Sequence, residues 1–185
     1  MKSVLISIKP KWCELIASGK KTTEARKTRP KCDTPFKCYI YCTKNAKELI
    51  KGDMTTTIDF VAKNNGKVIG EFVCRNMTCI QADIDSQGEK HLYNTAFIEN
   101  RMCLTDEKLF NYIYDGKRNT GWAWGISDLV IYDEPKELAD FKKINRECWY
   151  ADLGFSKRDC PECKNAECFM QRPPQSWCYC EEEEE

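Results

Sequence analysis

The stretch SGKKTTEAR, residues 18–26, combines lysine, glutamate and arginine at a spacing that suits a ligand site. Lys21 and Arg26 would neutralise a phosphate or another negative group. Glu24 would accept hydrogen bonds from a ligand or hold Arg26 in place. In a strand, positions 22, 24 and 26 point to one face. We therefore predict a site for an anionic or strongly hydrogen-bonding ligand. The alternative is a solvated surface or a structural ion pair with Glu24.

A group of cysteines near the C-terminus suggests a metal site. Cys160 and Cys163 form the tight knuckle CPEC, and Cys168 and Cys178 follow it. Four thiolates at this spacing would hold a structural zinc ion and tie down a segment that has little apolar core of its own. Free thiols and an iron–sulfur cluster or redox pair are the alternatives, and Cys180 could replace Cys178. The seven cysteines up to Cys103 fall mostly in strand or helix patterns, where cysteine is usually a small buried hydrophobe.

Other catalytic sets have little support in the sequence. His91 is the single histidine, and it lies in a polar stretch without an obvious nucleophile partner, so we expect an exposed loop residue. The phosphate loops GxxxxGK[ST] and GxGxxG do not occur in the sequence. Neither Ser/His catalysis nor nucleotide hydrolysis is indicated.

Composition bounds the kind of protein. A chain of 185 residues with 42% hydrophobic residues is sufficient for one domain with a real core and a small appendage. The sequence has neither a membrane-spanning apolar run nor a signal-peptide pattern, so we predict a cytoplasmic protein. In that compartment clustered cysteines bind metal more often than they form disulfides.

The charge distribution is uneven although the formal net charge is zero. Residues 1–51 contain 13 lysines and arginines against 4 aspartates and glutamates, while the chain ends in five glutamates, residues 181–185. A basic N-terminal third predicts a local patch for a negatively charged partner such as nucleic acid. The glutamate run is typical of a solvated tail.

The elements that would position these residues are mostly strands. We predict strands at 4–8, 22–27, 36–42, 67–80 and 126–132, and helices at 11–18 and 105–116. Pro10 and Thr105 suit the starts of the two helices, and Gly19 and Gly116 suit their ends. We also predict a bulge at Gly70, a short helical turn at residues 47–52 and a polar loop at residues 81–99. This pattern predicts an α+β fold, with a small mixed β-barrel as its architecture.

Read as GxKxxExR, the stretch from Gly19 to Arg26 resembles the signature of the ASCH family, which belongs to the PUA-like superfold. The resemblance extends to PFKCYIYCTK (35–44), GEFVC (70–74) and GWAWGISDLVIYDEPKEL (121–138), and it covers residues 3–141. The tail with RPPQSWCY looks like the C-terminus of longer phage and bacterial ASCH proteins. The resemblance implies a PUA-like barrel with two or three short helices over residues 1–145, and a Cys-rich extension over residues 146–185.

The resemblance also implies that RNA, another nucleic acid or a modified nucleoside binds in a cleft that the motif lines. The residues expected there are Lys9, Lys21, Glu24, Arg26, Tyr41, Lys44, Trp122 and Trp124. Tyr41 and the two tryptophans are candidates for stacking on bases. Core packing is the alternative for both tryptophans.

Two further function classes are open. A small ASCH subgroup hydrolyses acetylated cytidine with a lysine, a threonine and a glutamate. Lys21 matches its lysine, but Glu24 stands where its threonine belongs, so Thr22 or Thr23 with Glu71 would form a rearranged catalytic set. The third class is a phage-encoded module that binds a host protein.

Overall fold

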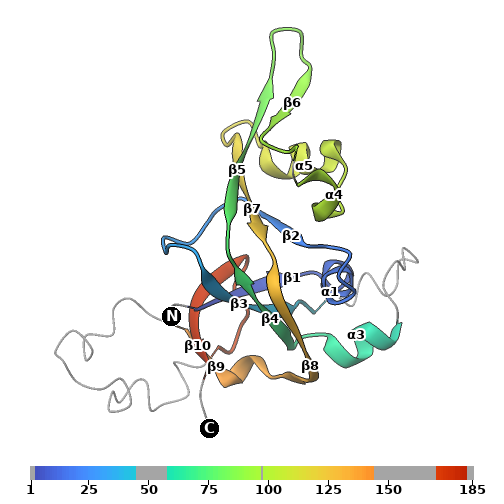
Figure 1. Ribbon diagram of the computed structural model, residues 1–185, viewed down its shortest axis with the longest axis vertical. Coiled ribbons are helices and arrows are strands. Elements are labelled where there is room, and N and C mark those ends of the chain that lie inside the picture. Colours follow the sequence, from blue (N-terminus) through green and yellow to red (C-terminus); the bar gives the residue numbers. More distant parts are fainter. Residues whose placement is uncertain (1–2, 45–57, 97, 144–169, 183–185) are drawn as a thin grey trace, which may run out of the picture. The chain divides into compact units, whose positions relative to one another are not determined.

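The computed structural model describes residues 3–44, 58–96, 98–143 and 170–182. The chain forms two compact units, each assembled from segments far apart in the sequence (Figure 1). Unit 1 comprises Met1–Cys13, Lys37–Glu71 and Val130–Glu185, and unit 2 comprises Glu14–Phe36 and Phe72–Leu129. No helix within the described ranges is long and apolar enough to cross a membrane.

The described strands form a six-stranded sheet, most of it in unit 1, and a four-stranded sheet in unit 2. The order in the six-stranded sheet is β8 (Ser127–Lys136), β4 (Val68–Cys74), β3 (Phe36–Cys42), β1 (Ser3–Ile8), β10 (Trp177–Glu182) and β9 (Phe141–Lys143). β1 runs parallel to β3 and antiparallel to β10, so Leu5 lies between Tyr39 and Cys178. The near-continuous apolar run of β1 is typical of a strand that is buried on both faces.

Helical segments complete unit 1. They are α3 (Ile58–Asn64) and the 3₁₀ turn η1 (Leu138–Asp140). Leu138 packs with Leu5, Tyr39 and Phe141 in one core cluster. Met170 and Cys180 belong to the same cluster, so the end of the chain contributes to the core of unit 1.

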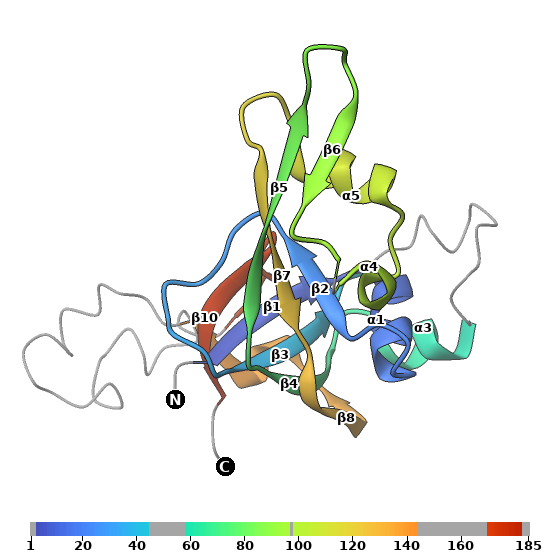
Figure 2. The same ribbon diagram turned by 45° about the horizontal axis from the view of Figure 1, so that its top comes forward.

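The four-stranded sheet is antiparallel throughout. Its order is β2 (Thr23–Arg26), β7 (Thr120–Gly125), β5 (Met77–Ile84) and β6 (Lys90–Tyr93). α1 (Pro10–Ala17) precedes β2, and α4 (Glu99–Met102) and α5 (Asp106–Ile113) follow β6. Figure 2 shows the β5–β6 hairpin with α5 beside it.

The two faces of this sheet differ because residues alternate along each strand. Ala25, Ile80, Ala82 and Ala123 point to one face, where they pack against Met102 of α4 and apolar residues of α5. Gly121 lies on this face too, because a Cβ there would come within 2.8 Å of Ile113 Cγ1. The residues between them, including Glu24, point to the opposite face.

Several predicted elements are confirmed. The α+β class is correct, the strand at 36–42 matches β3, and the strand at 4–8 matches most of β1. Thr105 caps α5 as expected, because its side chain accepts a hydrogen bond from the Lys108 backbone N–H. The predicted turn at 47–52 lies outside the described residues, as do residues 146–169 of the predicted Cys-rich extension.

Two predictions need correction. The strand at 67–80 is two strands, β4 and β5, separated at Arg75 and Asn76. The stretch 81–99 is not a loop, because β5 continues to Ile84 and β6 returns from Lys90. Gly70 lies where an added Cβ would collide with the backbone of β8 at Val130, so the close approach of that strand explains the glycine.

The hairpin of β5 and β6 escaped prediction because most of its exposed positions are polar. Asp85 turns the chain: its carboxylate Oδ1 accepts hydrogen bonds from the backbone N–H groups of Gln87 and Glu89, each at 2.9 Å. Gly88 supplies the positive φ of 87° that the turn needs. His91 therefore lies in a strand, exposed as expected, with Nε2 2.9 Å from Asp85 Oδ2.

Candidate functional site

The motif side chains Lys21, Glu24 and Arg26 form a buried charged cluster in unit 2. Lys21 Nζ lies 3.3 Å from Glu24 Oε2, and Arg26 Nη2 lies 3.1 Å from Glu24 Oε1. The three side chains are 2%, 8% and 10% exposed. Lys21 Nζ also donates a 2.7 Å hydrogen bond to the backbone oxygen of Met102 at the end of α4. Glu24 thus bridges two cations, and the cluster keeps one net positive charge.

Local structure explains how the motif reaches this arrangement. Gly19 ends the α1 segment with a φ of 72°, a conformation that favours glycine. The Lys21 backbone N–H then donates a hydrogen bond to the backbone oxygen of Leu15 in α1. The Thr22 backbone N–H donates to Arg101 O, and the Thr22 backbone oxygen accepts from the Ile126 N–H, each at 3.0 Å. The backbone of the motif is therefore fixed before β2 begins at Thr23.

Tyr112 of α5 is a further member of the cluster. The Arg26 side chain forms a hydrogen bond with its phenol. Burial raises the pKa of Tyr112 above its ordinary value of 10.0, and the Glu24 carboxylate adds to the increase, while the Arg26 guanidinium opposes it. The sequence did not indicate this residue, although a half-buried tyrosine usually has a hydrogen-bond partner for its hydroxyl.

Strand register brings both tryptophans to the face of the sheet that carries the motif charges. Glu24 pairs with Trp124 and Arg26 with Trp122, and directly opposite residues of an antiparallel pair share a face. Trp124 is fully buried and packs edge to face against Phe36, with ring centroids 5.7 Å apart. Its environment is that of a core residue.

Trp122 is the accessible one of the two tryptophans. It is half-buried, and the guanidinium carbon of the exposed Arg29 lies 4.6 Å from its ring centroid. This is a cation–π contact on a surface that a ligand can reach. Arg29 was not among the predicted site residues.

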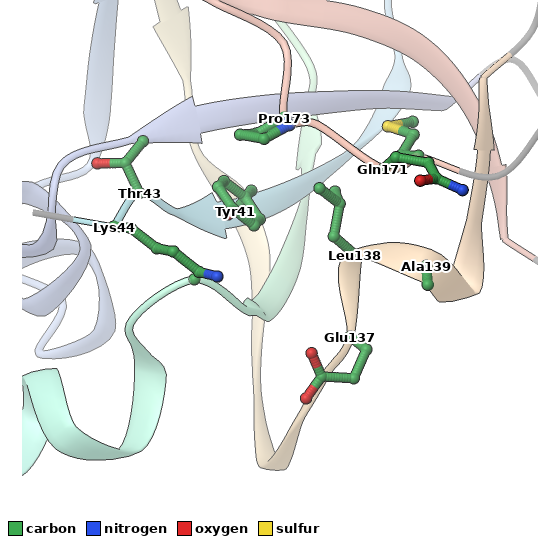
Figure 3. Close-up of a pocket in the computed structure, with 10 residues that line it drawn as sticks. Tyr41, Thr43, Lys44, Glu137, Leu138, Ala139, Gln171 and Pro173 are labelled. Carbon is green, nitrogen blue, oxygen red and sulfur yellow. The ribbon is translucent and has the colours of Figure 1, made fainter.

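The remaining predicted ligand residues, Lys9, Tyr41 and Lys44, belong to unit 1. Lys9 is exposed between β1 and α1, and its backbone oxygen accepts hydrogen bonds from the first turn of α1. Tyr41 and Lys44 line a cavity of about 820 Å³ together with Thr43, Glu137 and apolar residues (Figure 3). Burial raises the pKa of Tyr41, and the nearby Cys42 and Glu137 raise it further.

The residues of the alternative catalytic set are divided between the units. Lys21 is buried and Thr22 is exposed in unit 2, whereas Glu71 belongs to unit 1. Glu71 accepts a 2.6 Å hydrogen bond from Tyr132 Oη and lies 2.9 Å from Lys37 Nζ. Burial would raise the pKa of Glu71, but the hydrogen bonds from Tyr132 and Lys37 and the charges of Lys37 and Lys136 hold it below its ordinary value. An ionised glutamate with two partners suits a structural role.

Most of the predicted zinc site falls outside the part of the chain that the structure describes. Cys160, Cys163 and Cys168 lie in the undescribed stretch, so only Cys178 has a place, in β10. Its Sγ lies 3.8 Å from Met170 Sδ, and burial raises the pKa of its thiol to about 11. Among the described residues no cluster of three or more potential ligands occurs. The zinc site stays a prediction.

Comparison with known proteins finds the same fold in solved structures. No protein-family model and no curated protein matches the sequence. The structure resembles the crystal structure of ASCH from Zymomonas mobilis, with 17% sequence identity, a TM-score of 0.50, and 96% of this chain and 87% of that chain covered. A serine-to-alanine variant of that protein gives a TM-score of 0.51 at the same identity and coverage. This chain therefore has the α+β, PUA-like fold of an ASCH protein.

Proposed function

We propose that the protein belongs to the ASCH family and binds RNA or a nucleotide-like ligand at the four-stranded sheet of unit 2. The observation that carries the proposal is the register of β2 and β7, which pairs Arg26 with Trp122. A motif cation and an accessible indole thus occupy one row of the sheet. A base stacks on an indole and a phosphate attracts a cation, so Trp122 and the exposed Arg29 beside it offer both contacts that a nucleotide needs, while the mostly buried Arg26 adds positive charge in the same row.

The motif residues have different roles in this proposal. Lys21 is almost completely buried and already holds Met102 O and Glu24, so it positions the site from within. Glu24 aims Arg26, because a carboxylate between two cations fixes both of them. Arg29 and Trp122 meet the ligand: a base stacks on the indole, and the guanidinium that now covers the ring turns to a phosphate.

Fluorescence anisotropy with labelled single-stranded and hairpin RNA at two salt concentrations tests this proposal. We expect binding that weakens as salt increases. Trp122→Ala should lower the affinity about 5- to 150-fold, which corresponds to the stacking free energy of about 1–3 kcal/mol for one base.

The chain supplies a matched control for that variant. Trp12 is also half-buried and has a lysine, Lys11, with Nζ 5.3 Å from its ring centroid, but it lies in unit 1. Trp12→Ala should leave RNA affinity unchanged. Equal losses in the two variants, or no binding by the wild type at tens of micromolar, would reject the proposal.

A small nucleotide-like ligand is a second candidate, and the cavity of unit 1 favours it. Tyr41 offers an aromatic ring and a hydroxyl, and Lys44 offers a cation, in a space of about 820 Å³. Cavities of roughly 300–1,000 Å³ commonly hold small molecules. Calorimetric titration with mononucleotides and with acetylated cytidine checks this candidate. Lys44→Ala should weaken binding of the charged nucleotide more than that of the nucleoside, and equal effects would count against it.

A further inference from the structure

The sheet face that carries Arg26 and Trp122 continues beyond the motif. In register, Cys79 of β5 lies opposite Trp122 and so belongs to the row of Arg26. The next row on the same face holds Thr120, Gln81 and Tyr93, and a third row holds Asp83 and His91. The face therefore extends without interruption from β2 to β6.

The far part of this face is open and aromatic. Tyr93 is 49% exposed, Gln81 and His91 are exposed, and Cys79 is half-buried. The His91 and Tyr93 rings lie side by side, with centroids 6.4 Å apart. The core of unit 2 does not need them, because Ala82 and Leu92 on the opposite face supply the apolar contacts to α5. An exposed tyrosine beside a histidine on a rigid sheet is a surface that a planar ligand can cover.

Spacing and charge indicate which ligand fits. Trp122 and Tyr93 are separated by two strand spacings and one two-residue step, which amounts to about 12 Å. Exposed aromatics on a four-stranded sheet can stack two or three bases of a single strand. The exposed guanidinium of Arg29 lies at one end, over Trp122, and the carboxylates of Asp83 and Asp85 lie at the other end. A duplex keeps its bases paired inside, so only unpaired bases can use the aromatic rings.

We infer that this face, with Trp122 and Tyr93 as two stacking platforms and Cys79 and Gln81 between them, binds a short segment of single-stranded nucleic acid. The strand enters at Arg29, crosses β7 and β5, and ends at Tyr93 before the acidic hairpin tip. The inference rests on the proposed function and adds to it the class of nucleic acid, its path and a second contact point.

The test compares two probes, a labelled single-stranded RNA of about 12 nucleotides and a single nucleotide. Tyr93→Ala should lower the affinity for the RNA about 5- to 150-fold and leave the affinity for the nucleotide within about twofold, because only the longer ligand reaches β6. Tyr93→Phe keeps the ring and should keep the RNA affinity. Ile84→Ala is the matched control, since Ile84 is 38% exposed on the same hairpin but points to the opposite face.

Protection of a cysteine gives a second readout that does not depend on a variant. Alkylation of Cys79 should slow in the presence of the RNA, while alkylation of the half-buried Cys103, which directly follows α4, keeps its rate. If the RNA binds in a Trp122-dependent way but Tyr93→Ala binds like wild type and Cys79 reacts at an unchanged rate, the inference is overturned and the proposed function stands. If the wild type does not bind the RNA at all, the proposed function fails and the inference fails with it.

Discussion

The two faces of the four-stranded sheet are made from alternate residues of the same strands, yet they have opposite chemistry. The face toward α4 and α5 consists of small or branched apolar residues such as Ala25, Ile80 and Ala123. The other face carries two charges of the motif, two tryptophans and an exposed tyrosine. Because strand residues alternate with a period of two, one short segment can serve the core and a binding surface independently.

Glu24 is one position where this independence fails. It points to the binding face, yet its side chain is only 8% exposed between Lys21 and Arg26. Charges at this depth stabilise the fold only while all partners are present. At most positions of the sheet we therefore expect a substitution to change either the stability of the protein or its binding of the ligand. At Glu24 we expect it to change both.

The largest loss of stability is expected when the Glu24 carboxylate is removed. Glu24→Ala removes the carboxylate and leaves two buried cations uncompensated, so we expect a loss of about 3–5 kcal/mol in the free energy of unfolding. Urea denaturation measures it. Lys27→Ala is the control, because its pair with Asp115 is largely exposed and should contribute little. Similar losses in both variants would show that the buried cluster is not special.

The second-largest loss of stability is expected from a truncation on the apolar face. Ile80 is fully buried in the cluster that joins the sheet to α5. Ile80→Ala should cost about 3 kcal/mol, within the range of 2–5 kcal/mol for such truncations, through lost transfer free energy and a cavity. The folded fraction should bind RNA as wild type does. A change in affinity after correction for unfolding would contradict the separation of the two faces.

Tyr112 packs on the apolar side and also contacts the charged cluster. Its contribution to the free energy of unfolding should depend on pH. Tyr112→Phe removes the hydrogen bond to Arg26 and should cost about 1.5–3 kcal/mol at neutral pH. The folded-state pKa of Tyr112 is raised, so its contribution is complete below pH 10 and disappears as pH rises through the folded pKa. Wild type should therefore lose its advantage over the variant in alkaline urea titrations. A constant difference between pH 8 and pH 11 would disprove this.

The smallest expected effect concerns the helix that covers the apolar face. Thr105 caps α5 by accepting a hydrogen bond from the Lys108 N–H. Thr105→Ala should cost about 1 kcal/mol, whereas Thr105→Ser keeps the cap and should cost little. Thermal denaturation of both variants tests the difference. RNA affinity should be equal in the two variants, since neither touches the binding face.

Local pattern was sufficient to predict much of the fold. The aromatic and β-branched run of β3 and the capped, amphipathic α5 carry their signals within a few neighbouring residues. The motif strand was also correctly placed, apart from its ends. The hairpin formed by β5 and β6 was missed because most of its exposed residues are polar, which makes the stretch look like a loop.

The site was less predictable because it depends on register. The sequence indicates Lys21, Arg26 and Trp122 as separate candidate ligand residues. Because β2 and β7 are far apart in the chain, no local pattern predicts that Arg26 lies opposite Trp122. Tyr41 and Lys44, which the sequence analysis places in the same site as the motif, line a cavity in unit 1, and their grouping with the motif stays a prediction. Tyr93 was missed together with its strand.

The position of β10 between β1 and β9 has a consequence for how the protein is made. Ser3 pairs with Cys180, so the ribosome synthesises the two partners at widely separated times. Pairings between such distant residues form slowly. Until the partner strand has been synthesised, the unpaired edge of the apolar strand can pair with another chain. A stop codon just before Trp177 would thus encode the whole four-stranded sheet and still leave β1 with a bare edge on the nascent chain.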